Sequence, residues 1–151
     1  MVSRFERFSF AISEIYRYLH RITSDEMQKY GLKGPYAIYL ITMHRYPEGI
    51  TAARLGELCS RNKADVSRAM AELEEKRLII REGTSQTLYR ARLKLTEDGL
   101  AAARQLQERA RIAVDLGGKG LTEERRAVFY EALELIAENM QALSESGLPR
   151  D

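Results

Sequence analysis

Apolar residues recur at helical spacing in two segments near the ends of the chain. In the first segment they lie three or four positions apart, in one stripe along a helix: Phe5, Phe8, Ile12, Ile15, Leu19 and Ile22. The last segment repeats the pattern with Phe129, Leu133, Ile136, Met140 and Leu143. The sequence therefore predicts two terminal helices, each with an apolar face that needs a covering surface.

Helix-capping and helix-breaking residues divide the chain between these two stripes. Gly31 ends the first helix, and Pro35 stands at the start of the second. Residues suited to an N-cap precede the other predicted helices: Thr51, Asn62, Thr96 and Thr122. The predicted helices thus cover about residues 5–31, 35–46, 52–59, 62–76, 97–115 and 123–144, and the glycine-rich residues 117–120 separate the last two.

The helix that begins after Asn62 has two contrasting faces. Asp65 takes the acidic position of a capping box at its start. The predicted inner face is apolar and consists of Val66, Ala69, Met70 and Leu73. The opposite face is small, polar and cationic: Ala64, Ser67, Arg68 and Ala71. A helix with this outer face can lie close in a DNA major groove, where Arg68 can read guanine.

A short basic hairpin is predicted after this helix. Residues 78–80 are β-like, and residues 82–86 contain the Gly, Thr and Ser of a turn. The return strand alternates, with Tyr89, Ala91, Leu93 and Leu95 on the inner face and Arg90, Arg92 and Lys94 on the outer face. Helix, turn, helix and basic hairpin in this order predict a winged helix.

Size and composition indicate one soluble domain, residues 1–151, of 17.3 kDa. No apolar run approaches the roughly 20 residues of a membrane helix. The first ten residues lack the features of a secretory signal, and a single cysteine cannot form an internal disulfide, so we expect a cytoplasmic protein.

The net charge is only +2, but residues 51–96 hold 10 Lys and Arg against 6 Asp and Glu, a local excess of +4 that suits a polyanion.

Four motifs stand in and around the predicted winged helix: Asn62-Lys63-Ala64-Asp65-Val66-Ser67-Arg68, Leu73-Glu74-Glu75-Lys76, Leu95-Thr96-Glu97-Asp98-Gly99 and Leu121-Thr122-Glu123-Glu124. Together they resemble the MarR (multiple antibiotic resistance regulator) family of bacterial transcription factors, over nearly the whole chain. The fold expected is mainly α with a small β-hairpin: a winged helix at residues 33–96, flanked by a helical dimerisation region at residues 1–31 and 97–148. The expected DNA-binding residues are Lys63, Ala64, Asp65, Ser67, Arg68, Arg81, Arg90 and Arg92.

Two departures from the family pattern affect these expectations. The family usually has an acidic residue and an arginine in the wing, at the positions held here by Thr87 and Tyr89. Arg90, one position later, is the candidate to supply the cation to the minor groove. The family also tends to place glycine after the recognition helix, where this chain has Arg77, which forgoes an easy left-handed C-cap but puts a cation near the negative end of the helix.

The terminal stripes favour a homodimer, because the resemblance implies a dimerisation region built from terminal helices and a two-fold DNA site suits a two-fold protein. The alternative is packing of the first helix against the last within one chain. The expected interface residues are Phe5, Phe8, Ile12, Ile15, Leu133, Ile136 and Met140.

Few residues are candidates for catalysis, metal binding or redox chemistry. No phosphate loop, nucleophile elbow or Cys-x-x-Cys motif is present, so we expect neither an enzyme nor a cofactor. His20, His44 and Cys59 have no recognisable metal spacing, and Cys59 fits a buried core thiol better than a redox switch.

A cluster of aromatic and polar residues is expected beneath the recognition helix: Tyr16, His20, Tyr36, Tyr39 and Met43. They either line a pocket for a small aromatic effector, of the kind that often releases family members from DNA, or are ordinary packing. The sequence thus predicts a homodimeric transcriptional regulator, a repressor, that binds double-stranded DNA. The alternative is a helical dimeric adaptor whose winged helix binds protein.

Overall fold

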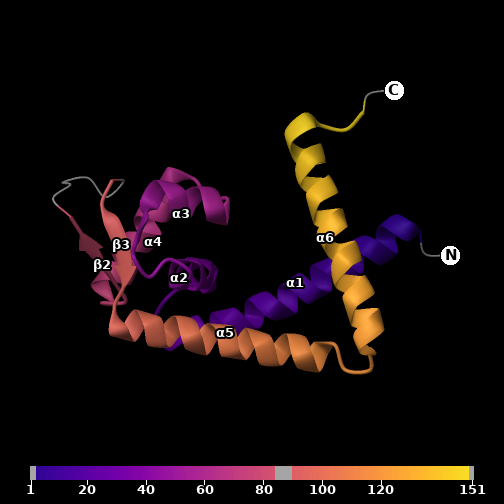
Figure 1. Ribbon diagram of the computed structural model, residues 1–151, viewed down its shortest axis with the longest axis horizontal. Coiled ribbons are helices and arrows are strands. Elements are labelled where there is room, and N and C mark those ends of the chain that lie inside the picture. Colours follow the sequence, from indigo (N-terminus) through magenta and orange to yellow (C-terminus); the bar gives the residue numbers. More distant parts are fainter. Residues whose placement is uncertain (1–2, 84–89, 150–151) are drawn as a thin grey trace. The chain divides into compact units, whose positions relative to one another are not determined.

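The computed structural model describes residues 3–83 and 90–149, and the statements below concern these residues. The elements are mostly helices with three short strands (Figure 1). In chain order they are α1 (Arg4–Gln28), the 3-10 helix η1 (Gly34–Tyr36), α2 (Ala37–His44), β1 (Ile50–Thr51), α3 (Ala52–Cys59), α4 (Lys63–Glu75), β2 (Ile79–Glu82), β3 (Arg92–Leu95), α5 (Glu97–Gly117) and α6 (Glu123–Ser146).

The chain separates into two compact units, residues 1–113 and 114–151. The first unit holds the winged helix together with α1 and most of α5, and the second holds α6. No helix within the described residues has both the length and the apolar character of a membrane span.

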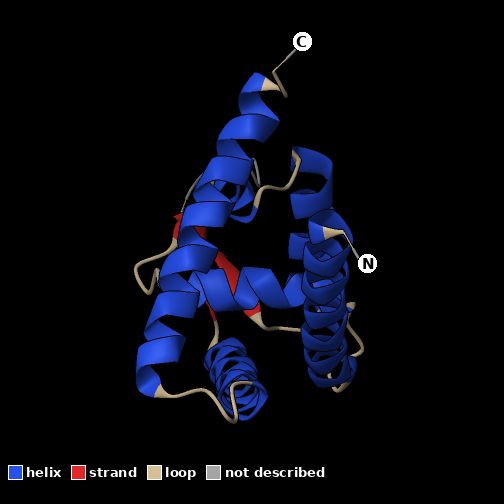
Figure 2. Cartoon of the chain, turned by 90° about the vertical axis from the view of Figure 1, so that its right-hand side faces the viewer, coloured by secondary structure: helices blue, strands red, loops and turns tan. Residues whose placement is uncertain are grey.

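The hydrophobic core of the first unit is formed by side chains of α2, α3, α4, the first half of α5 and the small sheet, whose strands are red in Figure 2. Leu40, Leu55, Met70, Leu93 and Leu106, one from each of five elements, are at most 1% exposed. Burial of each such side chain contributes about 1.5–3 kcal/mol, so this core fixes α4 in place. The inner face predicted for α4 is confirmed, because Val66, Ala69, Met70 and Leu73 are all buried.

The sheet has one strand more than the sequence predicted. Its order is β1-β3-β2, with both pairs antiparallel, and β3 pairs with β1 through Ile50 and Leu93. Two residues are too few to show an alternating pattern, so β1 had no signal in the sequence. The predicted return strand was also too long, since β3 begins at Arg92; Ala91 and Leu93 are buried as predicted, and Tyr89 lies outside the described residues.

The predicted caps are confirmed in atomic detail. The side chains of Thr51, Asn62 and Thr122 accept hydrogen bonds from the backbone N–H groups three residues on, at 3.2, 2.8 and 3.3 Å. The helix predicted over residues 35–46 is shorter, since a 3-10 turn precedes α2 and the α-helix ends at His44. Arg77 adopts a left-handed backbone with φ of 58°. The chain therefore turns after α4 as it would with glycine, and the C-cap that we expected to be lost is formed by a residue with a side chain.

Thr96 joins the sheet to α5. Its backbone N–H donates to the Leu78 carbonyl oxygen at 3.0 Å, and its hydroxyl donates to the Arg77 carbonyl oxygen at 2.7 Å. The same hydroxyl accepts from the Gly99 N–H at 3.0 Å. These bonds hold the first turn of α5 against the backbone at residues 77 and 78, and Gly99 is buried there.

Candidate nucleic-acid interface

The turn between α3 and α4 brings the two helices into close contact. Ser60 ends α3 in a left-handed conformation with φ of 52°, and the Arg61 N–H donates to the Gly56 carbonyl oxygen at 2.9 Å. A Cβ on Gly56 would lie 3.1 Å from the Arg61 oxygen and 3.3 Å from Val66 Cγ2. Glycine at this position therefore lets α4 pack tightly on α3, as a helix-turn-helix requires.

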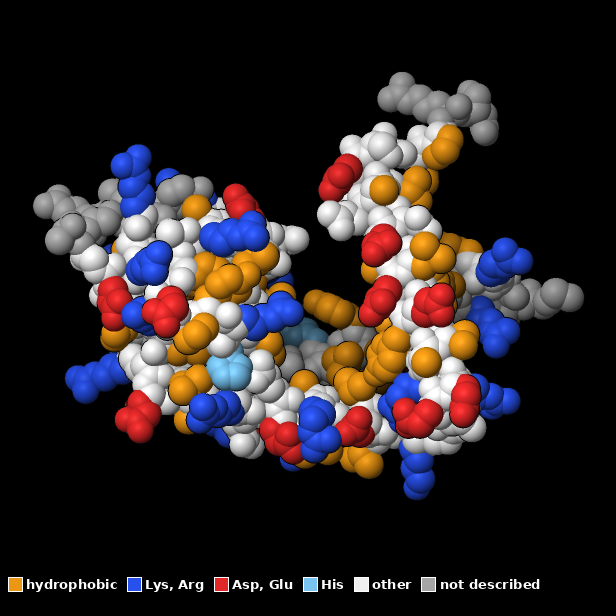
Figure 3. All heavy atoms as spheres, viewed as in Figure 1, with side chains coloured by type: hydrophobic (Ala, Val, Ile, Leu, Met, Phe, Trp, Pro, Cys, Tyr) orange, Lys and Arg blue, Asp and Glu red, His pale blue; other side chains and the backbone are white. Residues whose placement is uncertain are grey.

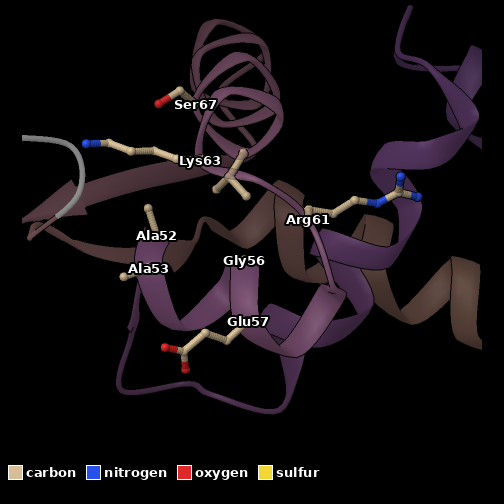
Figure 4. Close-up of a pocket in the computed structure, with 8 residues that line it drawn as sticks. Ala52, Ala53, Gly56, Glu57, Arg61, Lys63 and Ser67 are labelled. Carbon is tan, nitrogen blue, oxygen red and sulfur yellow. The ribbon is translucent and has the colours of Figure 1, made fainter. Parts of the chain in front are cut away.

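The outer face of the N-terminal half of α4 is accessible. Ala64 and Arg68 of the predicted outer face are exposed, as is Lys63, and Ser67 is half-buried. This half of α4 meets the start of α3 at an open cleft of about 170 Å³, which Lys63, Ser67, Ala52 and Ala53 help to line (Figure 4). In Figure 4 the side chains of Lys63 and Ser67 extend in the same direction, opposite to Arg61. Small residues beside a lysine and a serine form a surface that a polyanion can approach closely.

A chain of three polar side chains runs along the surface of α4. The Asn62 side-chain amide donates to Asp65 Oδ2 at 2.9 Å, and the Arg68 guanidinium donates to Asp65 Oδ1 at 2.5 Å. The Asn62 side-chain oxygen meanwhile caps the helix by accepting the Asp65 N–H. Only half of the predicted capping box is therefore formed, because the Asp65 carboxylate binds the side chain of Asn62 instead of its backbone N–H.

Most cations of the hairpin are held by neighbouring groups. Arg81 donates twice to Glu74 Oε2 of α4, at 3.1 and 2.8 Å, and Lys94 pairs with Glu82 at 2.9 Å. Arg92 donates to the Glu48 carbonyl oxygen at 3.1 Å.

Arg90 differs from these three cations. It is exposed and forms no hydrogen bond or ion pair with the other described residues. Thr87 and Tyr89, the two wing positions that differ from the family pattern, lie outside the described residues. Arg90 is therefore the described hairpin cation most available to a ligand.

The five residues of the predicted effector cluster are not all brought together. Tyr36 and Tyr39 are buried and line a recess of about 270 Å³ beside α4, together with Lys33, Pro35, Arg61, Asp65 and Arg68. Met43 is 1% exposed and belongs to the core. Tyr16 and His20 face each other on α1 with ring centroids 6.0 Å apart, and Tyr16 is 66% exposed. The lining of the recess includes neither residue of this α1 pair.

Both tyrosines of the recess stay protonated at neutral pH. Burial raises the pKa of Tyr36, and the hydrogen bond from its hydroxyl to Glu72 Oε1, at 2.9 Å, raises it further. Burial likewise raises the pKa of Tyr39. Their hydroxyls are therefore hydrogen-bond donors, and Tyr36 uses its own to hold Glu72 of α4. No sequence pattern predicted this bond, because residues 36 and 72 meet only through the fold.

The residues predicted to form the dimer interface are exposed, except Leu133, which is half-buried. On α1, Phe5 is 75% exposed and Ile15 is 51% exposed. On α6, Met140 is 56% exposed, and no described residue of that helix is buried. Figure 3 shows hydrophobic side chains along α6. Within its own unit, each predicted stripe is therefore an apolar surface that is exposed over much of its length.

Cys59 is a buried thiol that donates to Thr42 Oγ1 at 3.5 Å, which fits the core role expected of it. Among the described residues, no group of His, Cys, Asp and Glu side chains is arranged to hold a metal ion.

Comparison with known proteins points to one family. Residues 30–87 match the sequence model of the MarR family, and no curated protein matches the chain. A MarR transcriptional regulator from Methanosarcina mazei Go1 has a similar structure, with a TM-score of 0.78, 22% identity, and 91% of this chain and 92% of the other covered. The chain is thus similar to the MarR family in sequence over residues 30–87 and to MarR-family structures in fold over most of its length.

Two similar structures contain DNA. One is a putative MarR family transcriptional regulator from Listeria monocytogenes complexed with 26mer DNA, with a TM-score of 0.76, 24% identity and coverage of 93% of this chain and 95% of the other. The other is the MepR–DNA complex of Staphylococcus aureus, with a TM-score of 0.75, 17% identity and coverage of 87% and 97%. All three similar proteins have the fold observed here.

Proposed function

We propose that this chain, which has the winged helix and the fold of MarR-family transcriptional regulators, represses transcription by binding duplex DNA as a homodimer. The outer face of α4 is the observation that carries the proposal. There Lys63, Ser67 and Arg68 surround the small residue Ala64, while the opposite face of the helix is fixed in the core. Small and cationic residues on a rigid helix match the shape and charge of a DNA major groove.

The hairpin extends the proposed interface. Arg90 is exposed and available, and a cation at the edge of a winged helix suits the narrow minor groove beside the major-groove site. Arg81 and Arg92 lie on the same hairpin, but they donate to Glu74 and to the Glu48 carbonyl oxygen. We therefore assign Arg90 the larger role, with Arg81 and Arg92 contributing to the local positive potential.

The homodimer follows from the uncovered apolar stripes. Phe8, Ile12 and Ile136 on the two terminal helices are at least 36% exposed, whereas Leu133 is half-buried. Exposed apolar stripes of this length mark surfaces that bind protein, and closed two-fold symmetry is the commonest way to cover them. Two α4 helices in one dimer would then read half-sites about one helical turn apart. The proposal places the regulator in the cytoplasm.

A small aromatic compound is the proposed effector. The recess beside α4 has two buried tyrosines, and three cations also line it: Lys33, Arg61 and Arg68. An aromatic ligand with a negative charge would complement this lining. Because Arg68 and Asp65 belong both to the recess and to the surface of α4, an occupant would compete with DNA for Arg68.

Binding of a random duplex over a salt series tests the proposal. Fluorescence anisotropy with a labelled duplex should show affinity falling steeply between about 50 and 200 mM salt, because phosphate contacts release counterions. Selection from random DNA should return a two-fold sequence, and Arg68→Ala should cost about 1–3 kcal/mol on the selected site. Arg104→Ala is the matched control, since it removes an exposed cation from α5. Salt-independent or absent binding would instead favour the protein-binding adaptor.

A further inference from the structure

We propose that Asp65 is a positioning residue for sequence readout, which holds the Arg68 guanidinium in the orientation that reads a base. This inference rests on the proposed function, because it concerns how α4 discriminates between DNA sequences. Asp65 carries a negative charge on the face of α4 that would meet phosphates. A carboxylate there weakens general attraction to DNA, so its presence calls for a compensating role.

The geometry gives Asp65 a fixed position. Its backbone N–H is held by the Asn62 side-chain oxygen at 2.8 Å, and its Oδ2 accepts from the Asn62 amide at 2.9 Å. Asp65 is therefore attached to the capped end of α4 at two points, one on its backbone and one on its carboxylate. Its other oxygen, Oδ1, accepts from the Arg68 guanidinium at 2.5 Å. An arginine side chain has large rotational freedom, and a fixed, charged acceptor restricts it.

Arg68 keeps the donors that base recognition needs. The guanidinium has five N–H donors, and Asp65 accepts from one terminal nitrogen. The remaining donors can pair with O6 and N7 of guanine while the contact to Asp65 persists. The Arg68 side chain is 71% exposed, so a base can reach it without displacing other protein groups.

A second carboxylate on α4 is kept from competing for Arg68. Glu72 lies one turn further along the helix, and its Oε1 accepts from the Tyr36 hydroxyl at 2.9 Å. Asp65 is accordingly the carboxylate that binds Arg68, while Glu72 is tied to the segment before α2. This arrangement explains why the Arg68 side chain binds Asp65 and not Glu72.

Asp65→Asn tests the inference, since it removes the charge and keeps the shape of the side chain. Affinities are measured by anisotropy for three duplexes: the selected site, the same site with the Arg68-dependent base pair changed, and a random sequence. Discrimination at that base pair should fall about threefold or more. Affinity for the random duplex should rise about two- to fivefold, because a negative charge near the phosphates is gone.

These opposite changes separate positioning from a structural role. If Asp65 only stabilised α4, the variant would lose affinity for all three duplexes together. Glu75→Gln is the matched control, because it removes an exposed carboxylate from the far end of the same helix and should leave discrimination unchanged. Thermal unfolding of each variant confirms that binding is measured on folded protein.

A double-mutant cycle isolates the pair. In an Arg68→Ala background, Asp65→Asn should have no further effect on discrimination at the chosen base pair. Wild-type discrimination in the Asp65→Asn single variant overturns the inference but leaves the proposed function intact. If wild-type protein selects no preferred duplex at all, the proposed function itself fails, and the two failures are therefore distinguishable.

Discussion

Gly99→Ala is expected to destabilise the junction between the winged helix and α5. Gly99 is buried in the first turn of α5, against the backbone of Leu78. A Cβ at this position would overlap the Leu78 carbonyl oxygen and lie 2.9 Å from the Leu78 carbonyl carbon. The glycine of the Leu-Thr-Glu-Asp-Gly motif is therefore required by a close approach of two backbone segments.

The magnitude follows from two opposing effects. Alanine is a better helix former than glycine by about 1 kcal/mol, which favours the variant. Overpacking costs about 1–3 kcal/mol or more, and here the obstructing atom belongs to the backbone. The Leu78 oxygen cannot easily move, because it accepts the Thr96 N–H at 3.0 Å. We therefore expect a net loss of about 1–2 kcal/mol in the free energy of unfolding.

Urea denaturation followed by circular dichroism measures this loss, and thermal unfolding should show a lower Tm by about 2–4 °C per kcal/mol. Gly117→Ala is the matched control, since Gly117 ends the same helix and a Cβ there meets nothing within 4 Å. That variant should be as stable as the wild type or slightly more so. If Gly99→Ala were equally harmless, the close approach of α5 to Leu78 would be wrong.

Three further predictions concern the wing, the dimer and the turn after α4. Arg90→Ala should reduce the salt slope of DNA binding by about one unit, and equal slopes for the wild type and the variant would contradict this. Arg92→Ala, which loses the bond to the Glu48 carbonyl oxygen, should chiefly lower stability. Ile15→Glu or Leu133→Glu should split the dimer or unfold it, because an unpaired buried charge costs several kcal/mol, and sedimentation of the wild type as a 17.3 kDa monomer would refute the dimer. Arg77→Gly should raise the free energy of unfolding by about 0.5–1 kcal/mol in urea denaturation, since Arg77 has φ of 58° and glycine adopts this conformation without strain. A loss of stability would show that interactions of the Arg77 side chain outweigh the strain of its backbone.

The sequence predicted the helices well because their determinants are local. Thr51, Asn62 and Thr122 cap their helices through atoms three residues away, so each cap can be read from a short segment. The two faces of α4 were equally legible, since helical periodicity alone separates Val66 and Met70 from Lys63 and Arg68. The exposed, polar face of α4 was therefore predictable residue by residue.

Tertiary structure decided which of the cations remain available. The sequence placed Arg90, Arg92 and Lys94 on one outward row, but Arg92 donates to the Glu48 carbonyl oxygen and Lys94 pairs with Glu82. These partners come from other elements, so no pattern within a single strand reveals them. Electrostatic pairing depends on distance in space, which a sequence fixes only through the complete fold.

Three features arise from contacts between segments that are distant in the sequence: the strand β1, the recess beside α4 and the bond from Tyr36 to Glu72. β1 is defined by its pairing with β3, and the recess is lined by residues from the start of η1 to the middle of α4. Local sequence determined which helices form and which face of α4 is polar, because capping and periodicity act over a few residues. Only the tertiary structure determined which polar groups meet, because contacts between distant segments form only when the core brings those segments together.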